Sequence, residues 1–260
     1  MGERGQRVFI TGASSGIGAA LAHEYAAQGA TLGLLGRRRE ALEALAAGLP
    51  GAGAHRVYAV DVTDRAALAA AAADFIAGGG ADIVIASAGV SQGTLTERAE
   101  GLAVFDTVFA TNVNATVATF SHFIEAMREQ PGARRLVGIG SVAGIRGMRG
   151  AGAYCASKAA LLSYCESLRL ELKRSGIKVV TIAPGYIDTP MTRANRFPMP
   201  FLMPAERFAA QAVRAIARGA SYRVIPWQMG VVAKLLRALP NALFDYAFAR
   251  APQKRRGAQP

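Results

Sequence analysis

A glycine-rich turn near the start of the chain is the feature that most constrains how this sequence can fold. The turn TGASSGIG occupies 11–18, directly after the apolar run 7–10, and it leads into the alanine-rich stretch 16–28. The apolar run predicts a strand, and the alanine-rich stretch predicts a helix that ends before Gly29. Strand, glycine turn and helix in this order form the context that a dinucleotide-binding site requires.

The three glycines of this turn have separate expected roles. Gly12 permits the tight turn, Gly16 allows the backbone to approach a pyrophosphate, and Gly18 lets the helix pack close to the strand. The N-terminus of the helix then offers free N–H groups and a partial positive charge to phosphates. Taken by itself, the motif also fits a glycine-rich turn that binds no ligand.

The same order of strand and helix repeats along the chain. Strands are predicted at 7–11, 31–36, 56–60, 82–87, 135–141, 178–183 and 222–225. Helices are predicted near 16–28, 38–48, 64–77, 98–129, 153–175 and 204–218. This alternation indicates an α/β fold of the Rossmann type, doubly wound, with a mainly seven-stranded parallel sheet flanked by helices. A ligand would lie at the carboxyl ends of the strands, where the strand order reverses.

One domain is expected to hold most of the chain. A hydrophobic content of 52% in 260 residues supplies an ample core, and no low-complexity linker divides the sequence. We expect a single Rossmann-fold catalytic domain over 1–228, with a substrate lid at 190–204. A helical, basic C-terminal extension would follow over 229–260.

A second motif lies in the later half of the chain and carries candidate acid–base chemistry. Tyr154 and Lys158, in the run YCASK, are four residues apart and would share one face of a helix. An ammonium beside a phenol lowers the pKa of the phenol, which would suit proton transfer to or from a carbonyl near neutral pH. Ser141 ends the apolar run LVGIGS, so a strand would deliver it to the same site.

The two motifs together resemble the short-chain dehydrogenase/reductase family over roughly residues 7–190, and the spacing TGxxxGxG is similar to its single-domain oxidoreductase branch. The resemblance implies that Ser141 holds a substrate carbonyl, that Tyr154 passes the proton, and that Lys158 lowers the pKa of the tyrosine and holds the nicotinamide ribose. It implies that Asn112, in TNVNA, steadies a water and completes the catalytic set.

The resemblance also implies a binding site for a nicotinamide cofactor. Asp61 would contact the adenine ring, and Pro184 and Gly185 would belong to the loop that covers the nicotinamide. Together with the glycine-rich turn and two arginines at the end of the second predicted strand, the expected cofactor-binding set is Gly12, Ser14, Ser15, Gly16, Ile17, Gly18, Arg37, Arg38, Asp61, Val62, Ser87, Ala88, Gly89, Tyr154, Lys158, Pro184, Gly185, Ile187 and Thr189. One position departs from the family, which usually shows Asn-Ala-Gly where this chain has Ser87-Ala88-Gly89, so weaker local bracing is expected there.

The end of the second predicted strand indicates the cofactor preference. An acidic residue there would bind the ribose 2′-hydroxyl of NAD, but the chain has Arg37, Arg38 and Arg39 and no carboxylate before Glu40. An arginine side chain can bind a 2′-phosphate through two parallel N–H donors. We therefore expect NADP(H) to be preferred over NAD(H), with Arg37 as the first candidate to bind the 2′-phosphate and Arg38 as the second. A solvated helix start is the other interpretation of these arginines.

The expected reaction is reduction of a ketone or aldehyde by NADPH, with Tyr154 as proton donor. The lid at 190–204 is rich in Met, Phe and Pro, which favours an apolar substrate if these side chains do more than pack the lid. Two alternatives stay open: an NAD-dependent alcohol dehydrogenase, and a protein that binds NADPH as a sensor without catalysing a reaction.

The positive charge is concentrated toward the C-terminus. Of the net charge of +12, residues 191–260 contribute twelve Lys and Arg against Glu206 and Asp245. Val231, Val232, Leu235, Leu236 and Leu239 would form one apolar helix face, and Asn241, after Pro240, would cap a second helix through Phe248.

This extension admits four interpretations. It would suit a homo-dimer or homo-tetramer contact, the wall of a hydrophobic substrate pocket, or peripheral contact of 229–256 with an anionic membrane surface. Ordinary packing is the fourth, because 25 Arg against 5 Lys indicates a general compositional bias. No nucleic-acid motif is visible, so nucleic acid is not an expected partner.

Other sites and segments are not expected. The start MGERGQR lacks the apolar core of a secretory signal, and no run of 18 apolar residues is present, which favours a cytoplasmic protein that could be peripheral on the inner membrane face. His23, His55 and His122 show no metal-binding spacing. Cys155 and Cys165 lie ten residues apart on one predicted helix, about 15 Å, which is too far for a disulfide.

Overall fold

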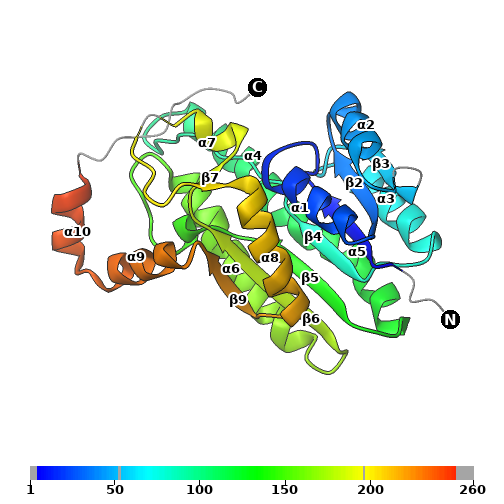
Figure 1. Cartoon of the computed structure of the whole chain (residues 1–260). Helices are drawn as coiled ribbons and strands as arrows, with labels where there is room; N and C mark the ends of the chain where they lie inside the picture. Colours follow the sequence, from blue (N-terminus) through cyan, green and yellow to red (C-terminus); the bar gives the residue numbers. More distant parts are fainter. Residues whose placement is uncertain (1–4, 52–53, 196, 250–260) are drawn as a thin grey trace.

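The computed structural model describes residues 5–51, 54–195 and 197–249, and its centre is a seven-stranded parallel sheet (Figure 1). The strand order is β3-β2-β1-β4-β5-β6-β9, and a separate parallel pair is formed by β7 and β8. The strands are β1 Arg7–Thr11, β2 Thr31–Gly36, β3 Arg56–Ala59, β4 Ile83–Ala86, β5 Arg134–Ile139, β6 Ile177–Pro184, β7 Ile187–Asp188, β8 Met203–Pro204 and β9 Tyr222–Ile225. The predicted doubly wound α/β fold is therefore confirmed.

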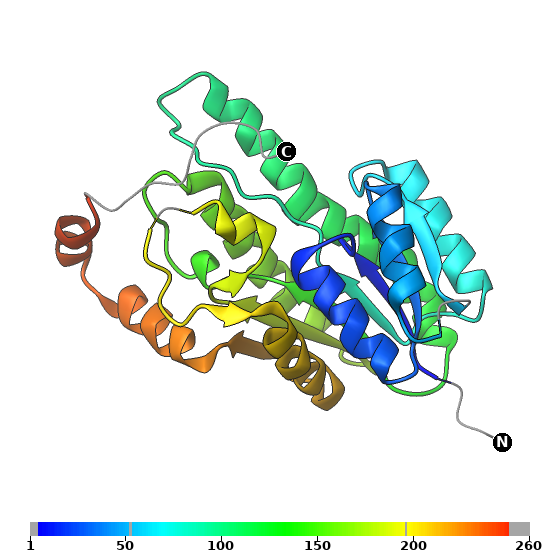
Figure 2. The same cartoon turned by 45° about the horizontal axis from the view of Figure 1, so that its top comes forward.

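Helices cover both faces of the sheet (Figures 1 and 2). They are α1 Gly16–Ala27, α2 Arg39–Gly48, α3 Arg65–Ala77, α4 Glu100–Phe109, the π-helical turn η2 Ala110–Asn114, α5 Ala115–Glu129, the 3₁₀ turn η3 Val142–Gly144, α6 Gly152–Glu171, α7 Pro190–Arg193, α8 Ala205–Arg218, α9 Trp227–Ala238 and α10 Asn241–Phe248. Among the described residues, none of these helices is both long enough and apolar enough to cross a membrane.

Alternation of side chains along the strands divides the core into two layers. On β1, Val8 and Ile10 point to the layer under α1, α2 and α8, whereas Phe9 points to the layer under α3, α5 and α6. Successive residues of a strand face opposite sides of a sheet, and both sides are covered here, so the strand is a continuous apolar run. Phe9 packs against Phe75 and Phe123, with ring centroids 5.4 and 4.9 Å apart.

The strand order reverses between β1 and β4, and this reversal fixes the place of the site. From β1 the chain proceeds through β2 to β3 on one side, then returns to β4 and continues through β5, β6 and β9 on the other. The loops that leave the carboxyl ends of β1 and β4 therefore diverge to opposite sides and leave room for a ligand. The glycine-rich turn follows β1 at this point.

Two sequence expectations are wrong in detail. The continuous helix near 98–129 is interrupted by the π-helical turn η2, which contains Asn112. Such a turn adds one residue to the helical ladder and is frequent at functional sites.

Asn241 does not cap α10 as expected. It is the first residue of the helix, after Pro240, and its side chain makes no capping hydrogen bond. The Asn241 Oδ1 instead accepts a hydrogen bond from Arg146, 3.0 Å away.

The start of the C-terminal extension packs on the α/β core. Helix α9 begins at Trp227, and its Met229 lies against Gly185, where an added Cβ would be 2.6 Å from the Met229 Cγ. Helix α10 lies further out, at the left edge of Figure 1. The boundary at 229 stays a prediction.

Candidate active site

The glycine-rich turn has the geometry that close approach of a ligand and of neighbouring backbone requires. Gly12 has a φ of +68°, and a Cβ added there would lie 2.7 Å from the Cα of Ala88. Gly16 has a φ of +55° and faces Thr189, and a Cβ on Gly18 would overlap the carbonyl oxygen of Gly12. Side chains at these positions would therefore force the turn, the loop after β4 and the first turn of α1 apart.

The start of α1 leaves backbone donors available. Ser15 precedes the helix in an extended conformation, and its side chain makes no capping hydrogen bond. The first N–H groups of a helix have no partner within it, so an uncapped N-terminus is suited to bind phosphate oxygens. Ile17 turns inward and packs against the core between the sheet and α1.

Thr11 ties the turn to the end of β4 and is a site residue that sequence reasoning missed. Its buried Oγ1 accepts hydrogen bonds from the N–H groups of Ser87 and Ala88, 3.1 and 3.2 Å away. At Ser87, where the chain departs from the family pattern, the loop after β4 is therefore held to β1 by hydrogen bonds between its backbone N–H groups and the Thr11 hydroxyl. The threonine that opens TGASSGIG was the available signal.

The two predicted arginines occupy different positions at the end of β2. Arg38 donates two hydrogen bonds to Ser14, one to the carbonyl oxygen at 3.1 Å and one to the Oγ at 3.2 Å, so it already contacts the glycine-rich turn. Arg37 is exposed and acts electrostatically on Asp61. Both cations therefore lie near the predicted adenosine side of the site.

Asp61 is held as a carboxylate. Burial raises the pKa of Asp61, but hydrogen bonds from the Thr63 backbone and hydroxyl and the positive charge of Arg37 outweigh burial, so this pKa lies below its ordinary value. The two hydrogen bonds measure 2.9 and 2.7 Å. The next residue, Val62, is buried beneath it.

Ser141 and Tyr154 are brought together as predicted. Ser141 follows β5 and precedes η3, and its Oγ accepts a hydrogen bond from the Ala143 N–H at 3.1 Å. Burial raises the pKa of Tyr154, and a hydrogen bond with Ser141 acts in the opposite direction without cancelling this effect. The tyrosine is therefore protonated at neutral pH and able to donate.

The expected effect of Lys158 on this tyrosine is not present in the structure. The Lys158 ammonium nitrogen lies 5.9 Å from the centroid of the Tyr154 ring and donates a hydrogen bond to the Ile139 carbonyl oxygen, 2.8 Å away. Burial lowers the pKa of Lys158 to about 8. The expectation of a lowered tyrosine pKa is wrong here, because the ammonium is turned toward β5 and desolvation dominates both groups.

Asn112 joins the π-helical turn to two other parts of the site. Its buried side chain exchanges hydrogen bonds with Val90, accepting from the N–H at 2.8 Å and donating to the carbonyl at 3.0 Å. It also donates to the Ser157 Oγ at 3.0 Å, and Ser157 donates to the Tyr154 carbonyl at 2.8 Å. Asn112 and Ser157 thus fix the helical turn that carries the tyrosine. Ser157, adjacent to Lys158 in YCASK, was not identified from the sequence.

Gly89 lies beside both Asn112 and Lys158. A Cβ added to Gly89 would be 3.3 Å from the Asn112 Oδ1 and 3.7 Å from the Lys158 ammonium nitrogen. The loop after β4, the π-helical turn and α6 therefore converge at one point. The four predicted catalytic residues lie on segments that meet here.

The loop after β6 reaches from this cluster back to the glycine-rich turn. Pro184 ends β6, and Gly185 donates its N–H to the Ile225 carbonyl at 2.9 Å. Ile187 is buried in β7, and Thr189 precedes α7 and donates its N–H to the Thr192 Oγ1, 3.0 Å away. Figure 2 shows this segment passing over the strand ends beside the start of α1.

The residues that are present fit a nicotinamide dinucleotide and do not suggest a metal. Three features meet where the strand order reverses: the glycines of the turn, which leave its backbone open, the uncapped N-terminus of α1, and the arginines Arg37 and Arg38. Within the described ranges, no cluster of three His, Cys, Asp or Glu side chains could hold a metal ion. Cys155 and Cys165 are free and buried, as expected for packing residues.

Comparison with known proteins identifies relatives. The family model for short chain dehydrogenase matches residues 6–198. An uncharacterised oxidoreductase of Myxococcus xanthus is 38% identical over 244 residues, which cover 93% of this chain and 96% of the relative. Levodione reductase is 28% identical with a TM-score of 0.76 and covers 86% of this chain and 98% of its own.

A third comparison supports the fold. The 3-ketoacyl-(acyl-carrier-protein) reductase of Brucella melitensis, solved in complex with NADH, has a TM-score of 0.76 at 24% identity. The matched parts are 85% of this chain and 97% of that structure.

Proposed function

The chain belongs to the short-chain dehydrogenase family, and on that premise we propose that it is an NADPH-dependent reductase of ketones or aldehydes, with a preference for apolar substrates. The family assignment makes it an oxidoreductase that uses a nicotinamide cofactor. The observation that carries the proposal is the meeting of Ser141, Tyr154, Lys158 and Asn112 beside the glycine-rich turn.

The proposed mechanism assigns each group of the chain a task. The cofactor, when bound, supplies the hydride that reduces the carbonyl carbon. The Ser141 hydroxyl binds the carbonyl oxygen and holds it next to the Tyr154 hydroxyl, with which it already shares a hydrogen bond. Tyr154 donates its proton to the oxygen as negative charge develops there.

Lys158 and Asn112 support this transfer. Lys158 would hold the nicotinamide ribose and return a proton to Tyr154, for which a pKa of about 8 is well placed. Asn112 and Ser157 fix the backbone of the Tyr154 turn, so the phenol stays in line with the substrate.

Preference for NADPH is supported by the cations at the end of β2. Arg38 contacts the glycine-rich turn through Ser14, and Arg37 is exposed beside it. Each charge-assisted hydrogen bond to a 2′-phosphate would contribute about 1.5–3 kcal/mol. We therefore expect NADPH to bind at least tenfold more tightly than NADH, and alanine at both arginines to remove the difference. Calorimetric titration with each cofactor measures this; equal affinities of the unaltered protein would contradict the preference.

An apolar substrate is supported by the segment 190–204. Within its described part, Phe201 and Leu202 are about half exposed, with exposed fractions of 50% and 46%, and Met203 is buried. The ring centroid of Phe197, within this segment, lies 6.2 Å from that of Tyr186, which precedes the segment. If this segment closes over the substrate, its exposed apolar side chains would bind an apolar substrate rather than a sugar-like one.

The test of the proposal is NADPH consumption with ketones and aldehydes of graded chain length, with Tyr154→Phe as the matched control. Turnover that depends on Tyr154 and rises with chain length supports the reductase. Turnover of alcohols with NAD and not of ketones with NADPH would identify the alcohol dehydrogenase alternative. Tight NADPH binding without turnover across the panel would identify a sensor.

For assembly and location, we propose a homo-dimer or homo-tetramer in the cytoplasm. Trp227, Val231 and Leu235 form an exposed apolar stripe along α9, with exposed fractions between 48% and 66%, and such a stripe supports self-association. Peripheral contact of 229–256 with an anionic membrane is the alternative for the same stripe. Light scattering and sedimentation with anionic vesicles, each with Leu235→Glu as control, separate the two.

A further inference from the structure

Arg146 joins the catalytic loop to the C-terminal helix pair. Its guanidinium donates hydrogen bonds to the carbonyl oxygens of Leu236 and Leu239, the latter at 2.6 Å, at the C-terminal end of α9. The same group lies 3.8 Å from the centroid of the Phe244 ring on α10. The last carbonyl groups of a helix have no hydrogen-bond partner within the helix and carry partial negative charge. The Arg146 guanidinium therefore stabilises the C-terminal end of α9 against the loop that carries this arginine.

Arg149 holds the other end of α10. Its guanidinium donates a hydrogen bond to the Ala249 carbonyl oxygen at 2.8 Å, directly after α10 ends. Two arginines of one short loop, 145–150, therefore contact the ends of both C-terminal helices. These contacts join residues about 90 to 100 positions apart in the sequence.

The loop that carries both arginines is part of the catalytic segment. It lies between Ser141 and Tyr154, and the Met148 backbone forms a hydrogen bond with the thiol of Cys155, the neighbour of Tyr154. The Gly150 carbonyl accepts a hydrogen bond from the Thr94 N–H at 2.9 Å, which fixes the loop from the opposite side. A hydrogen bond therefore joins the loop to the helical turn that carries the tyrosine.

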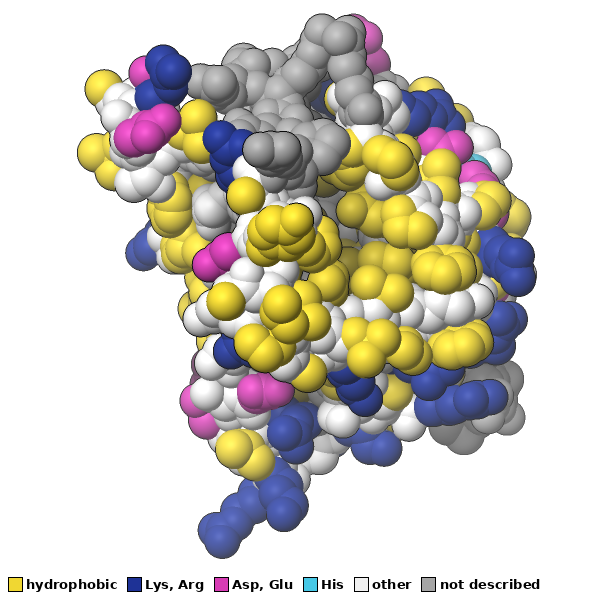
Figure 3. Space-filling view, turned by 90° about the vertical axis from the view of Figure 1, so that its left-hand side faces the viewer, with side chains coloured by type: hydrophobic (Ala, Val, Ile, Leu, Met, Phe, Trp, Pro, Cys, Tyr) yellow, Lys and Arg dark blue, Asp and Glu magenta, His cyan; other side chains and the backbone are white. Residues whose placement is uncertain are grey.

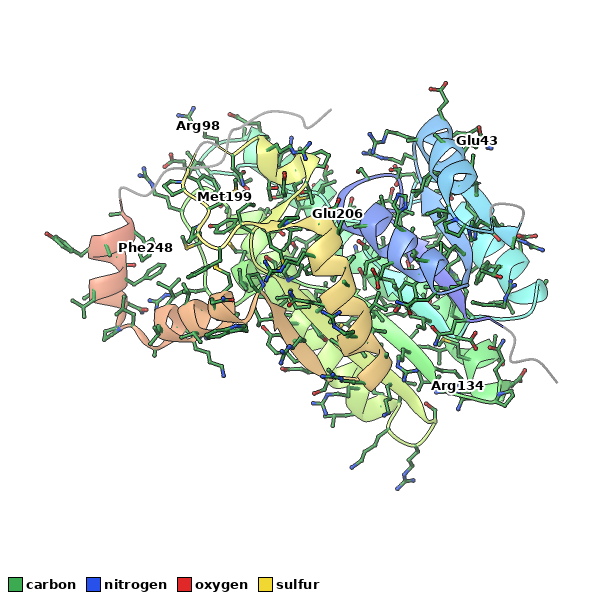
Figure 4. All side chains as sticks on the ribbon, in the orientation of Figure 1. Glu43, Arg98, Arg134, Met199, Glu206 and Phe248 are labelled. Carbon is green, nitrogen blue, oxygen red and sulfur yellow. The ribbon has the colours of Figure 1, made fainter. Side chains whose placement is uncertain are left out.

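A cavity of about 510 Å³ lies between this loop and α10. It is lined by Gly147, Met148, Arg149, Phe244, Asp245, Phe248 and Ala249, and the Phe244 and Phe248 rings stack with centroids 4.6 Å apart. Phe248 is labelled on α10 in Figure 4, on the part of the molecule that stands away from the sheet. The volume lies within the range of about 300–1,000 Å³ that is typical of small-molecule sites.

The two faces of α10 differ in exposure. Phe244 is 9% exposed on the cavity side, whereas Tyr246 is 90% exposed on the outer side. Hydrophobic side chains gather on the face of the molecule that carries α9 and α10 (Figure 3). The stacked aromatic pair of α10 and Met148 of the loop line the same cavity and form an adaptable apolar surface.

We propose that this cavity binds the distal hydrocarbon part of the substrate, and that Arg146 is the positioning residue that holds α10 as its outer wall. A long-chain aliphatic ketone bound at Ser141 would extend along residues 147–149 into the space beside Phe248. The inference rests on the proposed function for the identity of the reacting group. It adds that the C-terminal extension selects substrates by chain length.

The first experiment compares kcat/KM for dodecanone and butanone in the full-length protein and in Phe248→Ala. The ratio of dodecanone to butanone should fall about tenfold, which is about 1.4 kcal/mol of binding free energy, through an increase in the KM for dodecanone. Tyr246→Ala, on the outer face of the same helix, is the control and should leave the ratio unchanged. A ratio that is the same in Phe248→Ala and in the unaltered protein would overturn the proposal.

Further variants distinguish a role of these residues in lining the cavity from a general loss of structure. Arg146→Ala should lower the same ratio, and Arg146→Lys should restore part of it, because a lysine can still donate to the end of α9. Ala249→Phe fills the cavity without deleting a contact and should also reject dodecanone. An equal loss of activity toward both ketones in all three variants would assign these residues a purely structural role and contradict the inference.

Direct binding separates failure of this inference from failure of the proposed function. Dodecanol, with NADP present, should bind the unaltered protein in ligand-detected NMR and bind about tenfold more weakly to Phe248→Ala. This pattern without turnover of any ketone would refute the reductase and leave the cavity assignment intact. Equal binding to both proteins, or no binding to either, would refute the cavity assignment whatever the turnover.

Discussion

At the scale of single residues, the catalytic cluster is dominated by burial. Burial raises the pKa of Tyr154 and lowers that of Lys158 to about 8, so it shifts both groups toward their neutral forms, although Lys158 is still mostly protonated at pH 7. The spacing of Tyr154 and Lys158 correctly indicated a shared helix face. It could not indicate that the ammonium is directed to the Ile139 carbonyl, because this contact depends on where β5 passes.

The pH dependence of reduction should report Lys158. Lys158 is charged below about pH 8 and loses its proton above it, whereas Tyr154 keeps its proton over the neutral range. We therefore expect kcat/KM for ketone reduction to be constant at lower pH and to fall as pH rises through about 8. A decline in kcat/KM centred instead near the ordinary tyrosine pKa of about 10 would show that Tyr154 causes the decline, and it would contradict the role given to Lys158.

The buried ammonium should also cost stability. A pKa that falls from 10.5 to about 8 on folding corresponds to about 3 kcal/mol. The unfolded chain binds more protons between these two values, so stability rises with pH across this window. Lys158→Met should abolish turnover and raise the free energy of unfolding at neutral pH by up to about 3 kcal/mol, less the lost hydrogen bond to Ile139.

Chemical denaturation at neutral pH and above pH 8 measures this difference. The gain of Lys158→Met over the unaltered protein should narrow as pH rises from about 8 toward 10.5, where the native lysine becomes neutral in both states. A constant difference over this range would show that the ammonium is not desolvated.

At the scale of elements, the site depends on contacts between strand ends and loops. The periodic apolar runs made the strands predictable, because a strand buried on both faces must be continuously apolar. The brace from Thr11 to Ser87 and Ala88 was not predictable, since it joins positions 76 and 77 apart and needs the β1–β4 register. The π-helical turn at Asn112 likewise arises from its contacts with Val90 and Ser157.

Removal of the Thr11 hydroxyl tests this brace. Thr11→Val keeps the side-chain shape but leaves two part-buried N–H groups without this acceptor, which should lower the free energy of unfolding by about 1 kcal/mol. NADPH affinity should fall with it, because the loop after β4 would no longer be fixed beside Gly12. Thr11→Ser retains the oxygen and is the matched control. Unchanged stability and affinity in Thr11→Val would show that the brace is dispensable.

At the scale of the whole molecule, strand order brings together residues from distant parts of the sequence. The reversal between β1 and β4 places the glycine-rich turn, the loop after β4 and α6 at one edge of the sheet. The motifs predicted the fold and most of the candidate site, because short motifs encode local geometry. They left the role of the C-terminal helices open, because α9 and α10 are positioned by Arg146 and Arg149 from another part of the chain.

The proposed function depends on transfer of hydride to a carbonyl carbon with Tyr154 as the proton donor. The most direct measurement uses NADPH that is deuterated at both reducing positions, dodecanone as acceptor, and mass spectrometry of the product. The unaltered protein should give an alcohol with one deuterium on the carbinol carbon, and Tyr154→Phe should form it at least about a hundredfold more slowly. An alcohol without deuterium, or an equal rate from Tyr154→Phe, would contradict the account.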